Sequence, residues 1–310
     1  MKKLLLLSAL LFAGFSAKAI EENDSLGLPG DNLDLFGVLE LFKQSSSLED
    51  FEKKINDPAN EVNDLDLNND ENVDYIRVID QREGDAHAII LQVPVSATES
   101  QDVAAIEIEK TGADAADLQI VGDEELYGAD YIVEVKEETK SGAEARWQGF
   151  SPVAVVNVWL WPSVRFIYAP AYVVWVSPYR WAYYPVYWKP WRPVGWRIHR
   201  ARVVRYHMHY GYAHHHRMAR AHVCYHNHRV ASHSVHQRYE GHHQRHAARQ
   251  GKPNGNVQKN GGAQKNNGVQ KKGTTPKNGN AQKGKSQPQH KQGGGQKKAS
   301  AAPRGGGKRK

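Results

Sequence analysis

Oxygen-bearing side chains alternate with other residues in one short stretch of the sequence, residues 64–79 (DLDLNNDENVDYIRVI). The alternate positions are Asp66, Asn68, Asp70, Asn72 and Asp74. Calcium takes about six to eight oxygen ligands, and calcium loops supply them from positions 1, 3, 5, 7 and 9. The stretch therefore predicts a calcium site, in which Asn72 contributes its backbone carbonyl at position 7.

Two positions of this stretch depart from the helix-loop-helix type of calcium loop. Glu71 stands where the sharp turn prefers Gly, and Arg77 stands where a bidentate Glu would close the site. The β-forming residues from Tyr75 to Ile79 predict that a strand follows the loop. The stretch resembles the D-x-N-x-D calcium loops of dockerins and of integrin-type propeller blades, and in the blades the last Asp also opens a strand. The alternative is a solvated acidic turn in which Asn and Asp bond to their own backbone.

The charges of the chain are divided between its two halves. The 310 residues carry a formal net charge of +7. Residues 20–145 hold 8 Lys and Arg against 33 Asp and Glu, whereas residues 146–310 hold 30 Lys and Arg against the single acid Glu240. This asymmetry indicates an acidic folded head and a basic arm that contacts polyanions, a membrane surface or the head itself.

The N-terminus has the form of a secretory signal peptide. Lys2 and Lys3 precede an apolar run over residues 4–15, and Ala17 and Ala19, on either side of Lys18, form a small-residue cleavage pattern. The only Cys, Cys224, has no partner within the chain, so no intramolecular disulfide is expected. We expect an exported protein that lies in the periplasm, on the outer-membrane surface or outside the cell.

Composition divides the chain into five parts. They are a signal peptide (1–19), an acidic α+β domain with the calcium-type loop (20–145), an aromatic Trp/Tyr/Pro-rich segment (146–196), a His/Arg-rich segment (197–250) and a disordered Lys/Gly/Asn/Gln-rich tail (251–310). The tail has almost no apolar residues to bury, which predicts disorder. Its 15 Lys and Arg, without an acid, are expected to attract polyanions in a salt-dependent way.

The expected fold of the acidic domain is two helices followed by roughly five mostly antiparallel strands. Apolar spacing predicts helices around residues 35–42 and 48–55, the second capped by Ser47 with Asp50. The strands are expected at 73–80, 86–95, 104–109, 118–121 and 131–135. Residues 86–95 are nearly all apolar, which predicts a central strand covered on both faces. Alternation of Glu107 and Glu109 with apolar residues predicts that one face of the sheet is wet there.

Four segments together resemble a group of secreted, uncharacterised bacterial proteins. They are the calcium-type loop, SQDVAAIEIEKTG (100–112), LQIVGDEELYG (118–128) and VNVWLWPSVRFIYAPAYVVWVSP (156–178). The resemblance covers about half of the mature chain and implies export and a modular layout. It implies no activity, because the group has none that can be transferred.

Aromatic residues are concentrated in residues 146–196, where seven of the eight Trp lie between Trp159 and Trp196. Regular prolines leave pieces such as VRFIYA and AYVVWV, which are short enough for edge strands or extended segments. A membrane-spanning helix over residues 152–177 is an alternative, but Pro162, Pro170 and Arg165 count against it. Trp and Tyr interleaved with Arg and Lys are typical of surfaces that stack on sugars or bases.

Histidines are concentrated in the next segment, since residues 197–249 hold 14 of the 16 His. Such tracts bind borderline metals. Apart from Glu240 and Cys224, no carboxylate or thiolate joins them at a fixed spacing, so the sequence defines no closed zinc site. The preferred interpretation is a basic, partly helical segment whose charge rises below about pH 6.5, and loose metal binding by the His pairs is the alternative.

The sequence contains no Walker phosphate loop, no G-x-S-x-G elbow and no H-E-x-x-H motif. His87, the only His of the acidic domain, lies in an apolar strand where we expect a structural role. We therefore predict no enzymatic activity. The expected function is a cell-envelope or secreted binding protein whose calcium-stabilised head carries a basic aromatic arm for anionic glycans or lipopolysaccharide. Nucleic acid is expected to bind only non-specifically. The alternatives are a periplasmic metal-handling protein and an envelope protein anchored through residues 152–177 or at the membrane interface.

Overall fold

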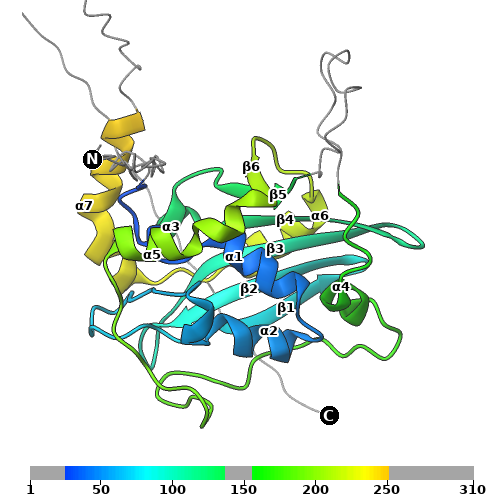
Figure 1. Cartoon of the computed structure of the whole chain (residues 1–310), viewed down its shortest axis with the longest axis horizontal. Coiled ribbons are helices and arrows are strands. Elements are labelled where there is room, and N and C mark those ends of the chain that lie inside the picture. The colour runs from blue at the N-terminus through cyan, green and yellow to red at the C-terminus, as the bar shows by residue number, and fades with distance from the viewer. Residues whose placement is uncertain (1–24, 137–155, 251–310) are drawn as a thin grey trace, which may run out of the picture. The chain divides into compact units, whose positions relative to one another are not determined.

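The computed structural model describes residues 25–136 and 156–250 of the chain. It is an α+β fold built on one antiparallel sheet with the strand order β1-β2-β3-β4-β5-β6 (Figure 1). The strands are β1 (Arg77–Glu83), β2 (Ala86–Pro94), β3 (Ser100–Gly112), β4 (Ala115–Gly122), β5 (Ile132–Val135) and β6 (Tyr210–Ala213). The helices are α1 (Leu35–Lys43), α2 (Leu48–Ile55), α3 (Glu124–Tyr127), α4 (Pro162–Ile167), α5 (Trp196–Val203), α6 (Ala219–His228) and α7 (His233–Gln250). The predicted fold class is confirmed, with six strands in place of roughly five. The predicted signal peptide and tail lie outside the described residues.

The two predicted helices form where their apolar spacing places them. The Asp34 carboxylate accepts a hydrogen bond from the Gly37 N–H (2.8 Å) and begins α1. The Ser47 hydroxyl accepts one from the Asp50 N–H (3.1 Å) and begins α2. Such caps satisfy N–H groups that the first turn leaves without partners. The ring centroids of Phe42 in α1 and Phe51 in α2 lie 5.3 Å apart, which fixes the two helices against each other.

Helices cover both faces of the central strand β2, and all nine of its residues are buried. On one face, Ile89 and Leu91 belong to the large apolar core that includes residues of α1, α2 and α4. On the other face, Ala88 and Ile90 pack with Tyr225 of α6. Burial on both faces is what the continuous apolar run predicts.

The expectation of a wet face on the third strand is wrong. Helix α6 packs on β1, β2 and β3, and Glu107 is fully buried beneath it. The alternation of Glu and apolar residues correctly separates the two faces of β3. It does not show that a distant segment supplies a polar cover, here the His222 ring, whose Nδ1 lies 2.7 Å from the Glu107 Oε1.

The His/Arg-rich segment contributes to the same sheet as the acidic domain. Strand β6 pairs with β5, with Tyr210 opposite Val135 and Ala213 opposite Ile132. Since β6 has the sequence Tyr-Gly-Tyr-Ala, its own residues give little strand pattern, and its pairing comes from the neighbouring strand. The basic arm is expected to contact polyanions, a membrane surface or the head. In residues 197–250 the arm does contact the head.

The aromatic segment covers the outer edge of β1. The Asp80 N–H donates to the Trp175 carbonyl (2.8 Å), and the Ser177 N–H donates to the Val78 carbonyl (3.0 Å). The piece AYVVWV is therefore extended beside an edge strand, whereas VRFIYA lies mostly in α4, which begins at Pro162. A helix long and apolar enough to span a membrane does not occur in residues 25–136 or 156–250.

Candidate functional site

The calcium-type loop, residues 66–74, makes a tight turn before β1. Asn69 and Glu71 have left-handed backbone angles, with φ of 60° and 65°. The sharp turn that would favour Gly is thus present at Glu71, at a cost of about 1 kcal/mol for a residue with a side chain. The Asp66 carboxylate accepts hydrogen bonds from the N–H groups of Asp70 (3.1 Å) and Glu71 (3.0 Å), and these bonds hold the turn.

Asp74 closes the loop and is the buried carboxylate of the group. It accepts hydrogen bonds from the Leu67 N–H (2.6 Å) and from the Asn68 amide (3.2 Å). Burial raises the pKa of the Asp74 carboxyl to about 7, the Leu67 bond opposes this rise, and the negative charges of Asp66 and Asp70 add to it. A cation in the loop would favour the ionised carboxylate and so offset the effects of burial and of charge repulsion on this pKa.

The predicted ligands share one loop, but their carboxylates are not drawn together as a closed cage. The Asn68 amide nitrogen lies 3.2 Å from carboxylate oxygens of both Asp70 and Asp74. The Asn72 amide donates to the Asp70 carbonyl (3.1 Å). Calcium binding would require Asn68 to turn its amide oxygen inward, and Asp66, Asp70 and Asp74 to approach one another. The calcium site remains a prediction.

Distant segments hold the loop in place. The Tyr239 hydroxyl of α7 donates to the Asp66 carbonyl (3.1 Å), and the Arg238 guanidinium donates to the Leu67 carbonyl. On the other side, the Val73 N–H donates to the Trp191 carbonyl (2.7 Å). The loop is therefore fixed between α7 and the aromatic segment.

An aromatic pocket of about 280 Å³ adjoins the calcium-type loop. Its walls combine oxygen-bearing loop residues with rings of the aromatic segment, and they include Asn68, Asp70, Asp74, Tyr75, Trp181, Tyr184 and Trp188. Ring centroids lie 5.3 Å apart for Tyr75 and Trp188, and 4.7 Å apart for Tyr184 and Trp188. A concave site with aromatic walls and a few converging polar groups is the usual form of a small-ligand site.

A tight turn presents Trp181 at this pocket. The Arg180 and Tyr183 backbones exchange two hydrogen bonds (3.1 and 2.8 Å), so Trp181 and Ala182 form the tip of the turn. Ala182 has a left-handed φ of 58°, a strained conformation that concentrates at binding sites. The Trp188 indole N–H is buried and has no acceptor among the described residues.

Glu52 of α2 ties the pocket to the core. Its buried carboxylate accepts hydrogen bonds from the Tyr75 hydroxyl (2.7 Å), the Ser177 hydroxyl (2.7 Å) and the Val78 N–H (2.9 Å). Burial raises the pKa of Glu52, and these hydrogen bonds oppose the rise. The network joins α2, β1 and the aromatic segment, so the orientation of Tyr75 is fixed from behind the pocket.

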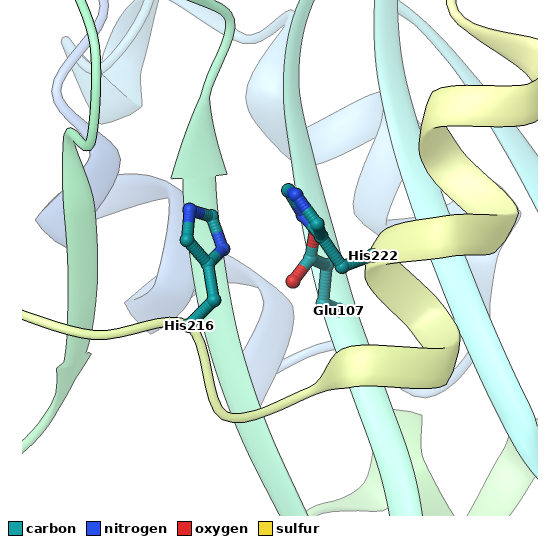
Figure 2. A group of neighbouring side chains, drawn as sticks. All are labelled: Glu107, His216 and His222. Carbon is teal, nitrogen blue, oxygen red and sulfur yellow. The ribbon is translucent and has the colours of Figure 1, made fainter.

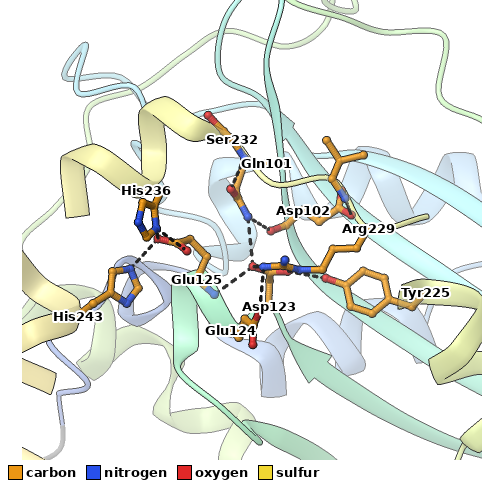
Figure 3. Close-up of polar contacts among 11 residues, drawn as sticks. Gln101, Asp102, Asp123, Glu124, Glu125, Tyr225, Arg229, Ser232, His236 and His243 are labelled. Carbon is orange, nitrogen blue, oxygen red and sulfur yellow. Dashed lines mark hydrogen bonds and ion pairs between the residues drawn. The ribbon is translucent and has the colours of Figure 1, made fainter. Parts of the chain in front are cut away.

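Several basic side chains of the His/Arg-rich segment contact acids of the head (Figure 3). The Arg229 guanidinium makes two hydrogen bonds to the buried Asp123 carboxylate (2.6 and 2.9 Å). The Tyr225 hydroxyl donates to the same carboxylate (2.6 Å). His236 and His243 of α7 both face the Glu125 carboxylate, at 3.0 and 2.7 Å. Because the Arg229 charge is neutralised by Asp123, Arg229 contributes less to a surface that binds polyanions.

The fold brings together a histidine cluster that no local sequence pattern predicts, defined as Glu107, His216 and His222. Within the described parts of the chain, it is the one group of three His, Cys, Asp or Glu whose ligand atoms all lie within 4.8 Å of one another. Its carboxylate is separated from His222 by 115 positions, so no local spacing could reveal it. His87 is fully buried, with its Nδ1 2.9 Å from the Asp80 carboxylate and its Nε2 without a partner among the described residues. Its expected structural role stays a prediction.

Searches for similarity to protein-family models, to curated proteins and to solved structures found no match for this chain.

Proposed function

We propose that this protein is an exported, non-catalytic binding protein that takes a saccharide unit of an anionic glycan into the aromatic pocket. The observation that carries the proposal is the juxtaposition of the calcium-type loop with Trp181, Tyr184 and Trp188 in one pocket of about 280 Å³. Export rests on the signal-peptide pattern of residues 1–19.

The two walls of the pocket match the two surfaces of a sugar ring. A pyranose has an apolar face of C–H groups, which packs on the flat faces of Trp and Tyr, and a rim of hydroxyls that require hydrogen-bond partners. The loop side offers the carboxylates of Asp70 and Asp74 and the amide of Asn68.

Calcium would complete the polar side of this site. An ion held by the predicted ligands Asp66, Asn68, Asp70, Asn72 and Asp74 would neutralise their mutual repulsion and draw their oxygens inward. Because the ion would bind the folded chain and not the unfolded chain, it would also stabilise the head.

Cations near the pocket favour an acidic saccharide over a neutral one. Arg180, Lys189 and Arg192 flank the pocket residues in the sequence, and all three are exposed. The side chain of Arg192 is 84% exposed and its nitrogen lies 3.9 Å from the Glu71 carboxylate, a distance that leaves it free to meet a second anion. Uronic acids and the phosphorylated sugars of lipopolysaccharide both carry such charges.

The test is the binding of an acidic oligosaccharide to the mature chain and to two Trp variants. Trp181→Ala removes a half-buried ring from the pocket, whereas Trp196→Ala removes a half-buried ring that lines a different cavity. Stacking of a planar ligand group on an aromatic side chain is worth roughly 1–3 kcal/mol, as for nucleic-acid bases. We therefore expect Trp181→Ala to weaken binding about fivefold or more and Trp196→Ala to leave it unchanged. Equal affinities of the two variants would contradict the proposal.

A further inference from the structure

We propose that the histidine cluster is a binding site for a borderline divalent metal ion of the zinc class, distinct from the calcium-type loop. Its three residues come from separate parts of the chain (Figure 2). Glu107 lies in β3, His222 lies in α6, and His216 lies in the link between β6 and α6. Their ligand atoms all lie within 4.8 Å of one another.

The Glu107 carboxylate has a vacant hydrogen-bonding position inside the protein. Its Oε1 lies 2.7 Å from the Nδ1 of His222, whereas its Oε2 is buried without a partner. A buried polar atom without a partner costs about 1–3 kcal/mol, and more for a charged group. The side chain of Glu107 is fully buried. A bound cation would give this oxygen the partner that the described residues do not supply.

The arrangement of the imidazoles supports a metal in preference to a simple ion pair. The rings of His216 and His222 lie 4.0 Å apart, and the ring of His226 lies 4.4 Å from that of His222. One nitrogen of the His216 ring faces Glu107 and His222, and the other points away from them (Figure 2). The His216 Nε2 lies 3.7 Å from the Asp130 carboxylate. Metal-bound His usually places its second nitrogen near such a group, which fixes the ring orientation.

The donor set identifies the class of metal. Two imidazole nitrogens and one carboxylate suit zinc and its neighbours copper, nickel and cobalt, whereas calcium prefers a cage of oxygens. A cavity of about 260 Å³ borders the cluster and is lined by His216, His222 and His226 among others. It leaves room for a water or a fourth ligand beside three protein ligands, as in an open zinc site.

A metal at this position would join the His/Arg-rich segment to the sheet of the acidic domain. His216 and His222 belong to the first, and Glu107 belongs to the second. Because the ligands come together only in the folded chain, the ion would stabilise the docking of α6 on the sheet.

The experiment is a titration of the mature chain, prepared without a polyhistidine tag, with zinc chloride in the presence of saturating calcium. Cobalt chloride serves as a second probe, because its visible absorption reports imidazole coordination in a four-coordinate site. The variants are Glu107→Gln, which keeps the shape of the side chain, and His216→Ala in the link before α6. The matched control is His228→Ala, an exposed His at the end of the same helix.

We expect one tight zinc equivalent in the wild-type chain and in His228→Ala. Loss of a group that only hydrogen-bonds to a metal ligand lowers metal affinity by about 10–100-fold, and loss of a ligand itself costs more. Glu107→Gln and His216→Ala should therefore each lose this equivalent while circular dichroism shows them folded. Unchanged zinc affinity in both variants would overturn the site. So would an equal loss in His228→Ala, because it would assign binding to the His tract as a whole.

Discussion

Replacing Arg229 with Met tests whether the basic segment is folded onto the acidic head. The Arg229 guanidinium makes two hydrogen bonds to Asp123, whose side chain is fully buried. Met keeps much of the packing of the Arg stem but leaves the carboxylate with neutral donors such as the Tyr225 hydroxyl. Removing one partner of a buried ion pair costs about 3–5 kcal/mol. Because Asp123 retains a strong donor, we expect a loss of about 3 kcal/mol in the free energy of unfolding.

The matched control is Arg220→Met on α6. Arg220 pairs with Glu109 (3.0 Å), but its side chain is 56% exposed. Exposed pairs contribute only about 0–1 kcal/mol, so we expect a small loss. Urea unfolding of the mature chains, followed by circular dichroism, measures both changes. Equal small losses would refute the reasoning, since they would mean that Asp123 is not buried under residues 225–229.

Three further predictions follow from single features of the fold. Burial raises the pKa of Asp102 to about 6, so the stability that its protonated form contributes is full below about pH 4 and is lost as pH rises through 6. Asp102→Asn should therefore flatten the fall of the urea unfolding midpoint between pH 4 and pH 7. An unchanged dependence of the midpoint on pH would contradict this prediction. A Cβ at Gly122 would lie 2.6 Å from the Tyr127 ring, whereas one at Gly195 would meet nothing within 4 Å. Gly122→Ala should therefore lower the free energy of unfolding by about 1–3 kcal/mol, while Gly195→Ala should melt at the wild-type temperature. Equal melting temperatures of the two variants would count against this packing. Calcium at a hundredfold excess over its Kd should stabilise the chain by about 2.7 kcal/mol relative to chelator, and identical melting curves would count against the calcium-type loop.

Local patterns in the sequence predict the parts of the fold that local residues determine. The helices over residues 35–42 and 48–55 and the buried strand over 86–95 follow from apolar spacing and from the cap at Ser47. Strand β6 could not be predicted in the same way, because Tyr-Gly-Tyr-Ala becomes a strand only beside β5. The cover over Glu107 was also beyond local pattern, since it comes from α6 more than a hundred positions later.

The two walls of the aromatic pocket could be predicted separately but not as one site. The spacing of Asp66 to Asp74 identifies the loop, and the concentration of Trp identifies the aromatic segment. Their contact depends on tertiary bonds such as the one from the Val73 N–H to the Trp191 carbonyl (2.7 Å). The histidine cluster shows the same limit, because its carboxylate ligand comes from β3 and lies more than a hundred positions before its His residues.

The central claim is that the calcium-type loop and the aromatic pocket form one saccharide site, and the most direct test is the coupling between the two ligands. The measurement is the affinity of the mature chain for one acidic oligosaccharide by calorimetry, in calcium and in chelator, at fixed ionic strength. Where two sites are coupled, binding of one ligand typically changes the affinity for the other by about 5–150-fold, and each ligand affects the other by the same factor. We predict that calcium tightens saccharide binding by at least fivefold and that the saccharide tightens calcium binding by the same factor. Equal saccharide affinities in calcium and in chelator, or no binding in either, would contradict the account.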